Sequence, residues 1–516
     1  MKLDRNKYLE SRSMRPRTVF FALLAVNVLL GLIVWLFPTD GITIVNDQKL
    51  KFVSFAELTG ESTSAIVEVD IDDVLAGVEL QEERDTVVVD TIETIVRVAV
   101  KTDSTKNRQR VDTVKRYRKL QLPSNNPYAL QMLKYGVKIL SKDKVVRILH
   151  YGDSQLEGDR ITDYFRNKMQ LIYGGEGPGI LLPNEPAASS RRSAFVSESK
   201  NFSKQAIYVK EGLVAGRPLG IGAAAFTISG PSSRFIAWNT EMDSSGNRHA
   251  VYTDTNQAQA YMQVRVGSSG YSLAKTHRKA TLLYGTDEPF VVNVRSDDYI
   301  HDYTLPLATE IGKYEWDIRT TNTLKLTFTK GKFPTIYGLA LDGERGVAVD
   351  NFAMRGSSAV GFSKMDVNLY GKQLKQMNVC AIMLQYGINV VPNVRSDYGY
   401  YKNILKKQLS SIKTAYPGIT VIVIGPSDMS RNRGGEMVSY SNIPLIRDAM
   451  QEAALESGCC FWDLYEAMGG ENSMAAWVKM GLAQKDYTHF SFKGARYVGE
   501  MLFNAIYQEI NTKQWN

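Results

Sequence analysis

Val145-Val146-Arg147-Ile148-Leu149-His150 leads directly into Tyr151-Gly152-Asp153-Ser154-Gln155, and an amphipathic run follows. The first six residues are mostly apolar and β-branched, which is typical of a strand buried on both faces. In the run that follows, apolar residues recur at helical spacing, at Ile161, Phe165, Met169 and Ile172. Ser154 is therefore predicted to lie in a strand-to-helix turn. Such a turn can present a nucleophile at the carboxyl edge of a parallel sheet.

A second motif, Asp486-Tyr487-Thr488-His489, lies near the C-terminus. A serine hydroxyl becomes a good nucleophile when a neighbouring base takes its proton, and a carboxylate usually holds that base in one tautomer. Of the five histidines in the chain, His489 combines a nearby acid with a position just before a predicted helix. Each motif alone is equally explained as a surface turn. Together and in this order, they predict a catalytic set of Ser154, His489 and Asp486.

Five apolar runs predict parallel strands at residues 145–149, 347–349, 379–384, 419–424 and 459–462. Between and after them, helices are predicted at residues 357–377, 400–415, 444–457 and 491–510. Apolar strands that alternate with helices are typical of an α/β fold with a parallel sheet buried on both faces. Open sheets of this kind bind ligands just beyond the carboxyl ends of their strands. Four candidate residues fall at such positions: Ser154, Gly356, Asn389 and His489.

These motifs resemble those of the SGNH (GDSL) hydrolase superfamily, whose fold is a flavodoxin-like three-layer α/β/α domain with five parallel strands. The resemblance covers residues 145–185 and 346–512. It implies that Ser154 is the nucleophile and that its own N–H is one donor to the oxyanion. It also implies that His489 is the base and that Asp486 is the acid that orients it.

Two further blocks of the resemblance concern the oxyanion hole. Asn351-Phe352-Ala353-Met354-Arg355-Gly356 matches the second block, so the Gly356 N–H is implied as a donor. Gly387-Ile388-Asn389 matches the third, so the Asn389 side-chain amide is implied as the remaining donor. Two positions depart from the pattern, because Val390 stands where many members carry Asp and Ala353 where many carry Gly. Neither departure removes one of the implied donors.

Residues 191–345 do not follow the α/β pattern. Alternating runs predict strands at residues 259–266, 279–284, 290–294 and 323–328, with Gly, Ser, Asn and Asp turns between them. This is typical of an antiparallel β-sandwich or jelly roll. Some SGNH members that act on O-acetylated polysaccharides are similar, with a carbohydrate-module-like sandwich inserted here. Trp238 and Trp316 could contact sugar rings, although aromatic residues on such strands are more often part of the core.

The N-terminal region predicts a membrane anchor. Residues 19–37 contain no charge and would span about 28 Å as a helix, close to the bilayer core of about 30 Å. The preceding tail, residues 1–18, is basic, so we expect it to stay in the cytoplasm and the remaining chain to face the extracytoplasmic, periplasmic side. A cleaved signal peptide is the alternative, but Leu36-Phe37-Pro38 lacks a small-residue cleavage pattern.

The predicted domain organisation follows from these segments. Residues 38–124 change from acidic to basic and offer little apolar content, which favours a stalk or spacer. The SGNH domain is then expected at residues 125–190 and 346–516, with the sandwich inserted at residues 191–345. The 516 residues, with 44% hydrophobic content, can bury large cores.

Composition predicts neither a disulfide framework nor a cofactor. The three cysteines are Cys380, Cys459 and Cys460, and the last two are adjacent in a predicted strand, so buried thiols are expected. The histidines are scattered and no Cys-x-x-Cys pair occurs, so no metal site is predicted. A net charge of +8 suits acidic surface polymers, but nucleic acid is not expected as a partner of an exported chain.

The resemblance implies a serine esterase that removes O-acetyl groups from cell-envelope polysaccharide or peptidoglycan through an acyl-serine intermediate. If a sugar hydroxyl replaces water as acceptor, the same site makes an O-acetyltransferase, with a membrane-bound acyltransferase as a candidate partner. A glycan-binding or assembly protein with an inactive site is the third alternative. The expected partners are the envelope glycan and, through the N-terminal helix, the membrane.

Overall fold

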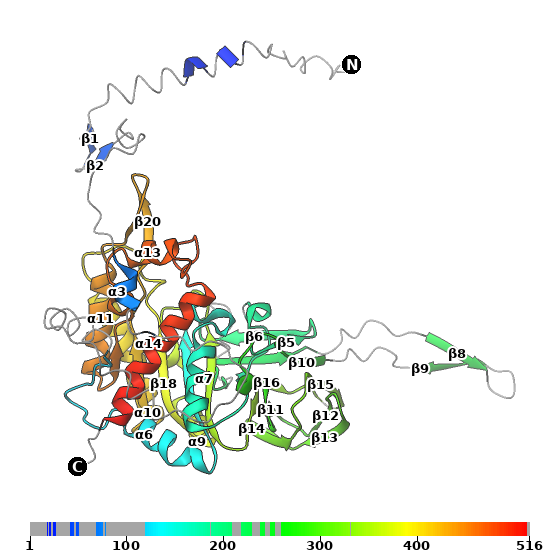
Figure 1. The fold of residues 1–516 in the computed structure, drawn as a ribbon. Helices are drawn as coiled ribbons and strands as arrows, with labels where there is room; N and C mark the ends of the chain where they lie inside the picture. Colours follow the sequence, from blue (N-terminus) through cyan, green and yellow to red (C-terminus); the bar gives the residue numbers. More distant parts are fainter. Residues whose placement is uncertain are drawn as a thin grey trace, which may run out of the picture. The chain divides into compact units, whose positions relative to one another are not determined.

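Five parallel strands form the central sheet of the α/β part (Figure 1). Their order across the sheet is β17 (Gly346–Ala353), β3 (Val145–Gly152), β18 (Val379–Gln385), β19 (Thr420–Ile424) and β22 (Cys460–Trp462). Counted along the chain, this is the order 2-1-3-4-5 of flavodoxin-like sheets. Every residue of the central strands β18 and β19 is buried, because helices cover both faces. The predicted α/β class with a parallel sheet is confirmed.

Successive residues of β3 show how the two faces are covered. Val146 and Ile148 belong to one apolar cluster, and Leu149 and Tyr151 belong to the other. The first cluster includes residues of α6 (Gln131–Lys138), α7 (Thr162–Tyr173) and α14 (Phe492–Asn511). The second cluster includes residues of α9 (Val367–Gln376), α10 (Gly399–Ala415) and α11 (Ile443–Glu456). The α/β part therefore has three layers.

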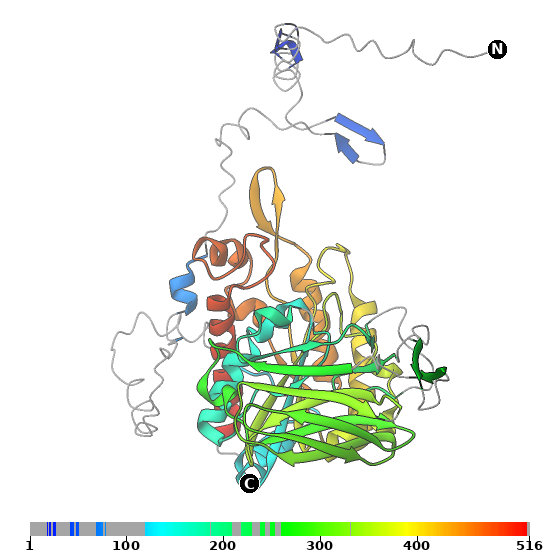
Figure 2. The same cartoon turned by 90° about the vertical axis from the view of Figure 1, so that its right-hand side faces the viewer.

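Two antiparallel sheets form the second part of the structure, drawn in green in Figures 1 and 2. The first has the order β13 (Ile300–Leu305), β12 (Phe290–Arg295), β15 (Thr323–Lys330), β10 (Ala260–Val266) and β5 (Ala194–Glu198). The second has the order β14 (Ala308–Asp317), β11 (Lys279–Thr286), β16 (Thr335–Asp342), β7 (Ala224–Ile228) and β6 (Phe202–Ala206). The four strands predicted in this region correspond to β10, β11, β12 and β15.

The burial patterns of these strands show whether one face or both faces of each sheet are covered. Residues of β12 alternate between buried and less buried, as expected for a sheet with one covered face. In β11 and β16, by contrast, every residue after the first is buried. The second sheet packs on the first with one face and on the α/β part with the other. A single apolar cluster accordingly contains residues of both sheets together with Leu149 and Tyr151 of β3.

A short strand and a buried charge network join the two parts. β4 (Gly179–Leu181) pairs antiparallel with β16, and its Ile180 N–H donates to Asp350 Oδ1 of β17 at 2.7 Å. Arg147 of β3 binds Asp350 with Nη1 at 2.9 Å and also forms an ion pair with Asp342, the last residue of β16. Each side chain of this network is almost completely buried.

Two described stretches of the predicted spacer pack on the α/β part. Ile71 of α3 (Ile71–Leu75) and Val78 are buried in the cluster that also contains Trp477 and Met474. Gln121 forms an antiparallel bridge with Phe461 of β22, through two backbone hydrogen bonds of 2.8 and 3.0 Å.

The computed structural model describes residues 119–185, 187–208, 218–229, 238–242, 248–252, 260–330 and 332–512, with short stretches between residues 18 and 78. The chain divides into two compact units, Met1–Val67 with Arg431–Val438 and Glu68–Ser430 with Ser439–Asn516. No helix within the described ranges is long and apolar enough to cross a bilayer. Most of the predicted anchor, residues 19–37, lies outside those ranges, so the anchor stays a prediction.

Candidate active site

The nucleophile candidate lies in the predicted strand-to-helix turn. β3 ends at Gly152, and a 3₁₀ turn follows over Ser154–Asp159. The Asp153 side chain caps this turn by accepting the Gln155 N–H at 3.0 Å. A Cβ on Gly152 would lie 2.8 Å from the Gln385 carbonyl oxygen and 2.6 Å from Leu156, so only glycine fits between β3 and β18 here. The close approach of the two strands sets where Ser154 leaves the sheet.

Ser154, His489 and Asp486 form a continuous row of hydrogen bonds. Ser154 Oγ lies 2.8 Å from His489 Nε2, and His489 Nδ1 lies 2.7 Å from Asp486 Oδ2. The other carboxylate oxygen, Asp486 Oδ1, accepts the N–H groups of Thr488 and His489, each at 3.0 Å. Partial burial opposes ionisation of Asp486, but these hydrogen bonds keep its pKa below the usual value. A charged Asp486 holds the Nδ1–H tautomer, which leaves Nε2 free to accept the serine proton.

The two other predicted oxyanion donors come from the loops after the neighbouring strands. Gly356 follows β17 with φ +77°, and a Cβ there would meet nothing within 4 Å, so its backbone faces open space. Asn389 follows β18, and its Nδ2 donates one hydrogen to the Ser357 carbonyl at 2.9 Å. A side-chain amide carries two hydrogens, so the second remains for a ligand. In the part of the chain that the structure describes, the N–H groups of Ser154 and Gly356 bond to no other residue.

An ion pair that the sequence did not predict joins the nucleophile turn to the Gly356 loop. Arg355 Nη2 donates to Glu157 Oε2 at 2.7 Å, and Arg355 Nε donates to the second oxygen of the same carboxylate. The Met354 N–H also donates to the Gly152 carbonyl at 2.7 Å. Residues on both sides of Ser154 therefore hold the segment that leads to Gly356.

A buried polar network lies behind the turn. His150 Nε2 lies 3.2 Å from Gln385 Oε1, and His150 Nδ1 lies 3.0 Å from Thr162 Oγ1. Thr162 Oγ1 donates to Asn351 Oδ1, and Asn351 Nδ2 donates to the Leu156 carbonyl at 3.1 Å. Complete burial lowers the pKa of His150 to about 3, so this imidazole is neutral. His150 is therefore a core residue that supports the turn.

The cysteines and one of the two candidate sugar-binding tryptophans lie in the core. Cys380, Cys459 and Cys460 are buried free thiols, as predicted, and burial raises the pKa of Cys380 to about 12. Within the described ranges, no group of three or more His, Cys, Asp or Glu side chains could hold a metal ion. Trp316 is 6% exposed and stacks on Tyr303 with ring centres 5.7 Å apart. The side chain of the other candidate, Trp238, lies outside the described residues.

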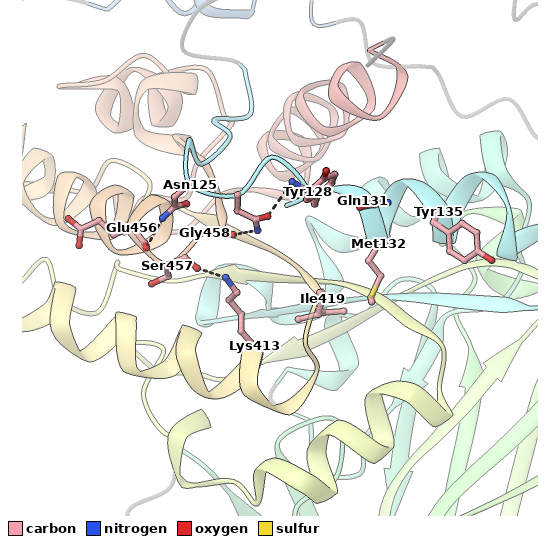
Figure 3. A pocket seen from close by; sticks show the side chains of 12 residues that line it. Asn125, Tyr128, Gln131, Met132, Tyr135, Lys413, Ile419, Glu456, Ser457 and Gly458 are labelled. Atoms are coloured by element: carbon pink, nitrogen blue, oxygen red, sulfur yellow. Dashed lines mark hydrogen bonds between the residues drawn. The ribbon is translucent and has the colours of Figure 1, made fainter. Parts of the chain in front are cut away.

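A pocket of about 720 Å³ lies at the opposite edge of the sheet (Figure 3). Its lining includes Gly418 and Gly458, which precede β19 and β22, whereas Ser154 follows β3. Polar side chains of this lining bind the turn that follows α11. Asn126 Nδ2 donates to the Gly458 carbonyl, and Lys413 Nζ donates to the Ser457 carbonyl. These contacts hold the protein chain together. None of Ser154, His489 and Asp486 lines this pocket.

Comparison with known proteins identifies the fold. No protein-family model matches the sequence, and no curated protein matches it. A solved structure of a peptidoglycan O-acetylesterase is similar, with a TM-score of 0.54 and 20% identity over 75% of this chain and 97% of that chain. This likeness shows that the two chains share a fold.

Two other esterase structures match less extensively. A family two carbohydrate esterase from Clostridium thermocellum has a TM-score of 0.23 and 8% identity over 53% of this chain and 99% of its own. An acetyl xylan esterase has a TM-score of 0.24 and 14% identity over 31% of this chain and 81% of its own. Neither likeness is close enough to support an argument about this protein.

Proposed function

We propose that this protein is a serine esterase of the SGNH type that removes O-acetyl groups from cell-envelope polysaccharide or peptidoglycan. The observation that carries the proposal is the hydrogen-bonded row of Ser154, His489 and Asp486 at the carboxyl edge of the parallel sheet. The N–H groups of Ser154 and Gly356, which bond to no other residue that the structure describes, lie on the same edge. A nucleophile, a base with its orienting acid and donors for negative oxygen are the parts that acyl transfer requires.

In the first half of the reaction, His489 Nε2 takes the proton of Ser154 Oγ as that oxygen attacks the ester carbonyl. The carbonyl oxygen becomes negative and accepts hydrogen bonds from the N–H groups of Ser154 and Gly356 and from the Asn389 amide. Asp486 stabilises the imidazolium that forms. His489 then gives the proton to the departing sugar oxygen, so a sugar hydroxyl leaves and the acyl group stays on Ser154.

In the second half, a water molecule attacks the acyl-serine while His489 accepts its proton. The same donors hold the second oxyanion. Collapse of this intermediate breaks the bond to Ser154 Oγ, which recovers its proton from His489, and the carboxylic acid leaves. The net reaction is ester plus water to acid plus alcohol, and it needs no cofactor.

The choice of acetate and glycan rests on two supports. The shared fold is that of a protein described as a peptidoglycan O-acetylesterase, and the likeness covers 75% of this chain. The sequence motifs resemble those of SGNH enzymes that deacetylate envelope glycans. We further propose that residues 19–37 anchor the chain in the membrane, with the catalytic part on the extracytoplasmic side.

Reaction of the full chain with a fluorophosphonate probe tests the catalytic serine. The wild-type protein should be labelled on one residue, and Ser154→Ala, which keeps the turn but lacks the hydroxyl, should not be labelled. A folded wild-type protein that takes up no label would count against every enzymatic role, and glycan binding without catalysis would then be the better proposal.

A second assay separates hydrolysis from transfer. The protein is incubated with an activated acetyl ester and with oligosaccharides from peptidoglycan or polysaccharide, and both products are measured. Release of free acetate supports the esterase. Accumulation of acetylated sugar supports an O-acetyltransferase that works with a membrane-bound acyltransferase.

A further inference from the structure

The side chain of Gln155 contacts the backbone on both sides of His489. Gln155 directly follows Ser154 and is 2% exposed. Its Nε2 donates to the Thr488 carbonyl at 2.7 Å, and its Oε1 accepts the Phe490 N–H at 3.4 Å. The same Nε2 also donates to Ser427 Oγ at 3.1 Å. One amide therefore binds the residue before the candidate base and the residue after it.

Arg160, at the end of the same turn, contacts the same segment. Its Nη1 donates to the Phe490 carbonyl at 3.0 Å, and its Nη2 donates to the carbonyl of Ser154 itself at 3.3 Å. Its Nε donates to the Glu157 carbonyl at 2.8 Å, which fixes the guanidinium to its own turn. The planar fork of arginine suits such simultaneous contacts to separate carbonyl groups.

Hydrogen bonds within the His489 segment cannot by themselves place the imidazole against Ser154. Asp486 accepts the N–H groups of Thr488 and His489, so these bonds fix His489 only relative to Asp486. The segment lies at the surface, where the side chains of Asp486 and His489 are 45% and 27% exposed. Outside this segment and its immediate neighbours, Ser430 holds the Tyr487 carbonyl through its N–H, but Ser430 follows β19 and not β3.

We propose that Gln155 and Arg160 are positioning residues that hold the His489 segment at hydrogen-bonding distance from Ser154. This inference rests on the proposed function. Both side chains extend from the nucleophile turn, so the serine and the groups that locate its base all lie within residues 154–160. A displacement of about 1 Å between reacting groups can cost about 100-fold in rate, so loss of either contact should be visible in catalysis.

The principal test is Gln155→Met, which keeps the length and volume of the side chain but removes its hydrogen bonds. We expect kcat for a small acetyl ester to fall by about 10- to 100-fold while KM changes less than about 2-fold, because Gln155 is buried and its polar groups bind protein atoms. Gln155→Glu should lose as much, because a carboxylate would face the Thr488 carbonyl with no hydrogen to donate.

Gln170→Met is the matched control. Gln170 is also 2% exposed, and its Nε2 donates to a backbone carbonyl, that of Gly177, at 3.0 Å. This variant should lose similar stability in urea unfolding and keep the wild-type kcat. In Gln155→Met, the low-field NMR signal of the His489 Nδ1 proton should persist, because Asp486 still binds it locally.

A kcat of Gln155→Met within 2-fold of wild type would overturn the proposal while leaving the proposed function intact. Equal losses of kcat in Gln155→Met and Gln170→Met would also overturn it, because the effect would then reflect general destabilisation. If Gln155→Met does not fold, Arg160→Lys decides in the same way, since lysine keeps the charge but cannot bind two carbonyls as a fork. A wild-type protein that is neither labelled by fluorophosphonate nor active would instead refute the proposed function.

Discussion

Two carboxylates near Ser154 show how the surroundings of a residue decide its chemistry. Asp486 is half exposed and accepts two backbone N–H groups, so its pKa is lowered and it stays charged beside His489. Asp153 is 1% exposed, and burial raises its pKa to about 7 although the Gln155 N–H partly offsets the effect. The charged residue can orient a base, whereas the buried one caps a turn.

The Asn389 amide is the most direct residue-scale test of the oxyanion hole. Asn389→Ala should lower kcat by about 10² to 10³-fold, because one donor to the negative oxygen is lost. Steady-state hydrolysis of an acetyl ester measures this effect. Asn393→Ala, in the same exposed loop, should retain the wild-type rate. An active Asn389→Ala would show that another group supplies the third hydrogen bond.

The raised pKa of Asp153 predicts a pH-dependent stability. In the unfolded chain this carboxyl loses its proton near pH 4, whereas in the folded chain it keeps the proton up to about pH 7. Folding therefore binds a proton between these values, and this contribution to the free energy of unfolding declines as pH rises. Asp153→Asn removes the decline, so the variant should gain about 2 to 4 kcal/mol relative to wild type between pH 4 and pH 8. Urea unfolding at several pH values measures the difference.

Asp486→Asn should change the pH dependence of the free energy of unfolding in the opposite direction. The folded pKa of Asp486 is lowered, so its contribution to stability is present above pH 4 and is lost as pH falls. The difference in free energy of unfolding between this variant and wild type should therefore shrink as pH falls through the acid range. If the free energy of unfolding of each variant differed from that of wild type by the same amount at every pH, both pKa assignments would be contradicted.

At the residue scale, short motifs predicted the triad but not the groups that hold it. Gly152-Asp153-Ser154 and Asp486-x-x-His489 carry their chemistry within a few positions, so a sequence reveals them. Gln155 and Arg160 bind backbone groups of residues 330 or more positions away. Such bonds need no particular side chain in the partner residue, so they leave no pattern to find. The Arg355 and Glu157 pair, separated by 198 positions, was missed for the same reason.

At the element scale, the strands were predictable because each is a continuous apolar run. β18, β19 and β22 lie within one residue of their predicted ends. The predicted helix at residues 357–377 was wrong at its start, because α9 begins at Val367. Asp366 caps that helix by accepting the Leu369 N–H, and Gly361 has φ +113°, which a helix does not allow. The order of strands across the sheet had no local signal.

The contact between α9 and α10 gives an element-scale prediction. A Cβ on Gly371 of α9 would lie 2.0 Å from the Ala415 carbonyl oxygen at the end of α10. Alanine gains about 1 kcal/mol in helix propensity, but here it must push two helices apart. Gly371→Ala should therefore lower the free energy of unfolding by about 1 to 3 kcal/mol.

Urea unfolding checks this value against a neighbour on the same helix. Lys372 is 64% exposed and forms a surface ion pair with Glu310, so Lys372→Ala should change stability by less than about 1 kcal/mol. A stabilised Gly371→Ala would mean that the two helices are farther apart than described.

At the scale of the whole molecule, one apolar cluster joins the antiparallel sheets to the parallel sheet. Unfolding the antiparallel part would expose Leu149 and Tyr151 of β3, and unfolding β3 would expose β16. We therefore expect a single cooperative transition, with coincident urea curves from far-UV circular dichroism and from tryptophan fluorescence. Trp316 reports on the antiparallel part and Trp462 on the parallel sheet, since both are buried.

Two separated transitions would contradict the shared cluster. Trp316→Phe and Trp462→Phe, measured one at a time, would then assign each transition to its part. The sequence predicted two kinds of β structure but not this dependence, because the residues that face the junction do not differ in type from any other core residue.

Arg147 has a consequence for the exchange of domains. Its guanidinium is shared between Asp350 of the parallel sheet and Asp342 of the antiparallel part. A chimaera that replaced the antiparallel part with an unrelated module would remove Asp342 and leave Arg147 Nη2 without its acceptor in a dry interior, at a cost of about 1 to 3 kcal/mol. Successful grafting onto this scaffold therefore requires that position 147 be changed together with the module, or that the incoming module bring its own acid.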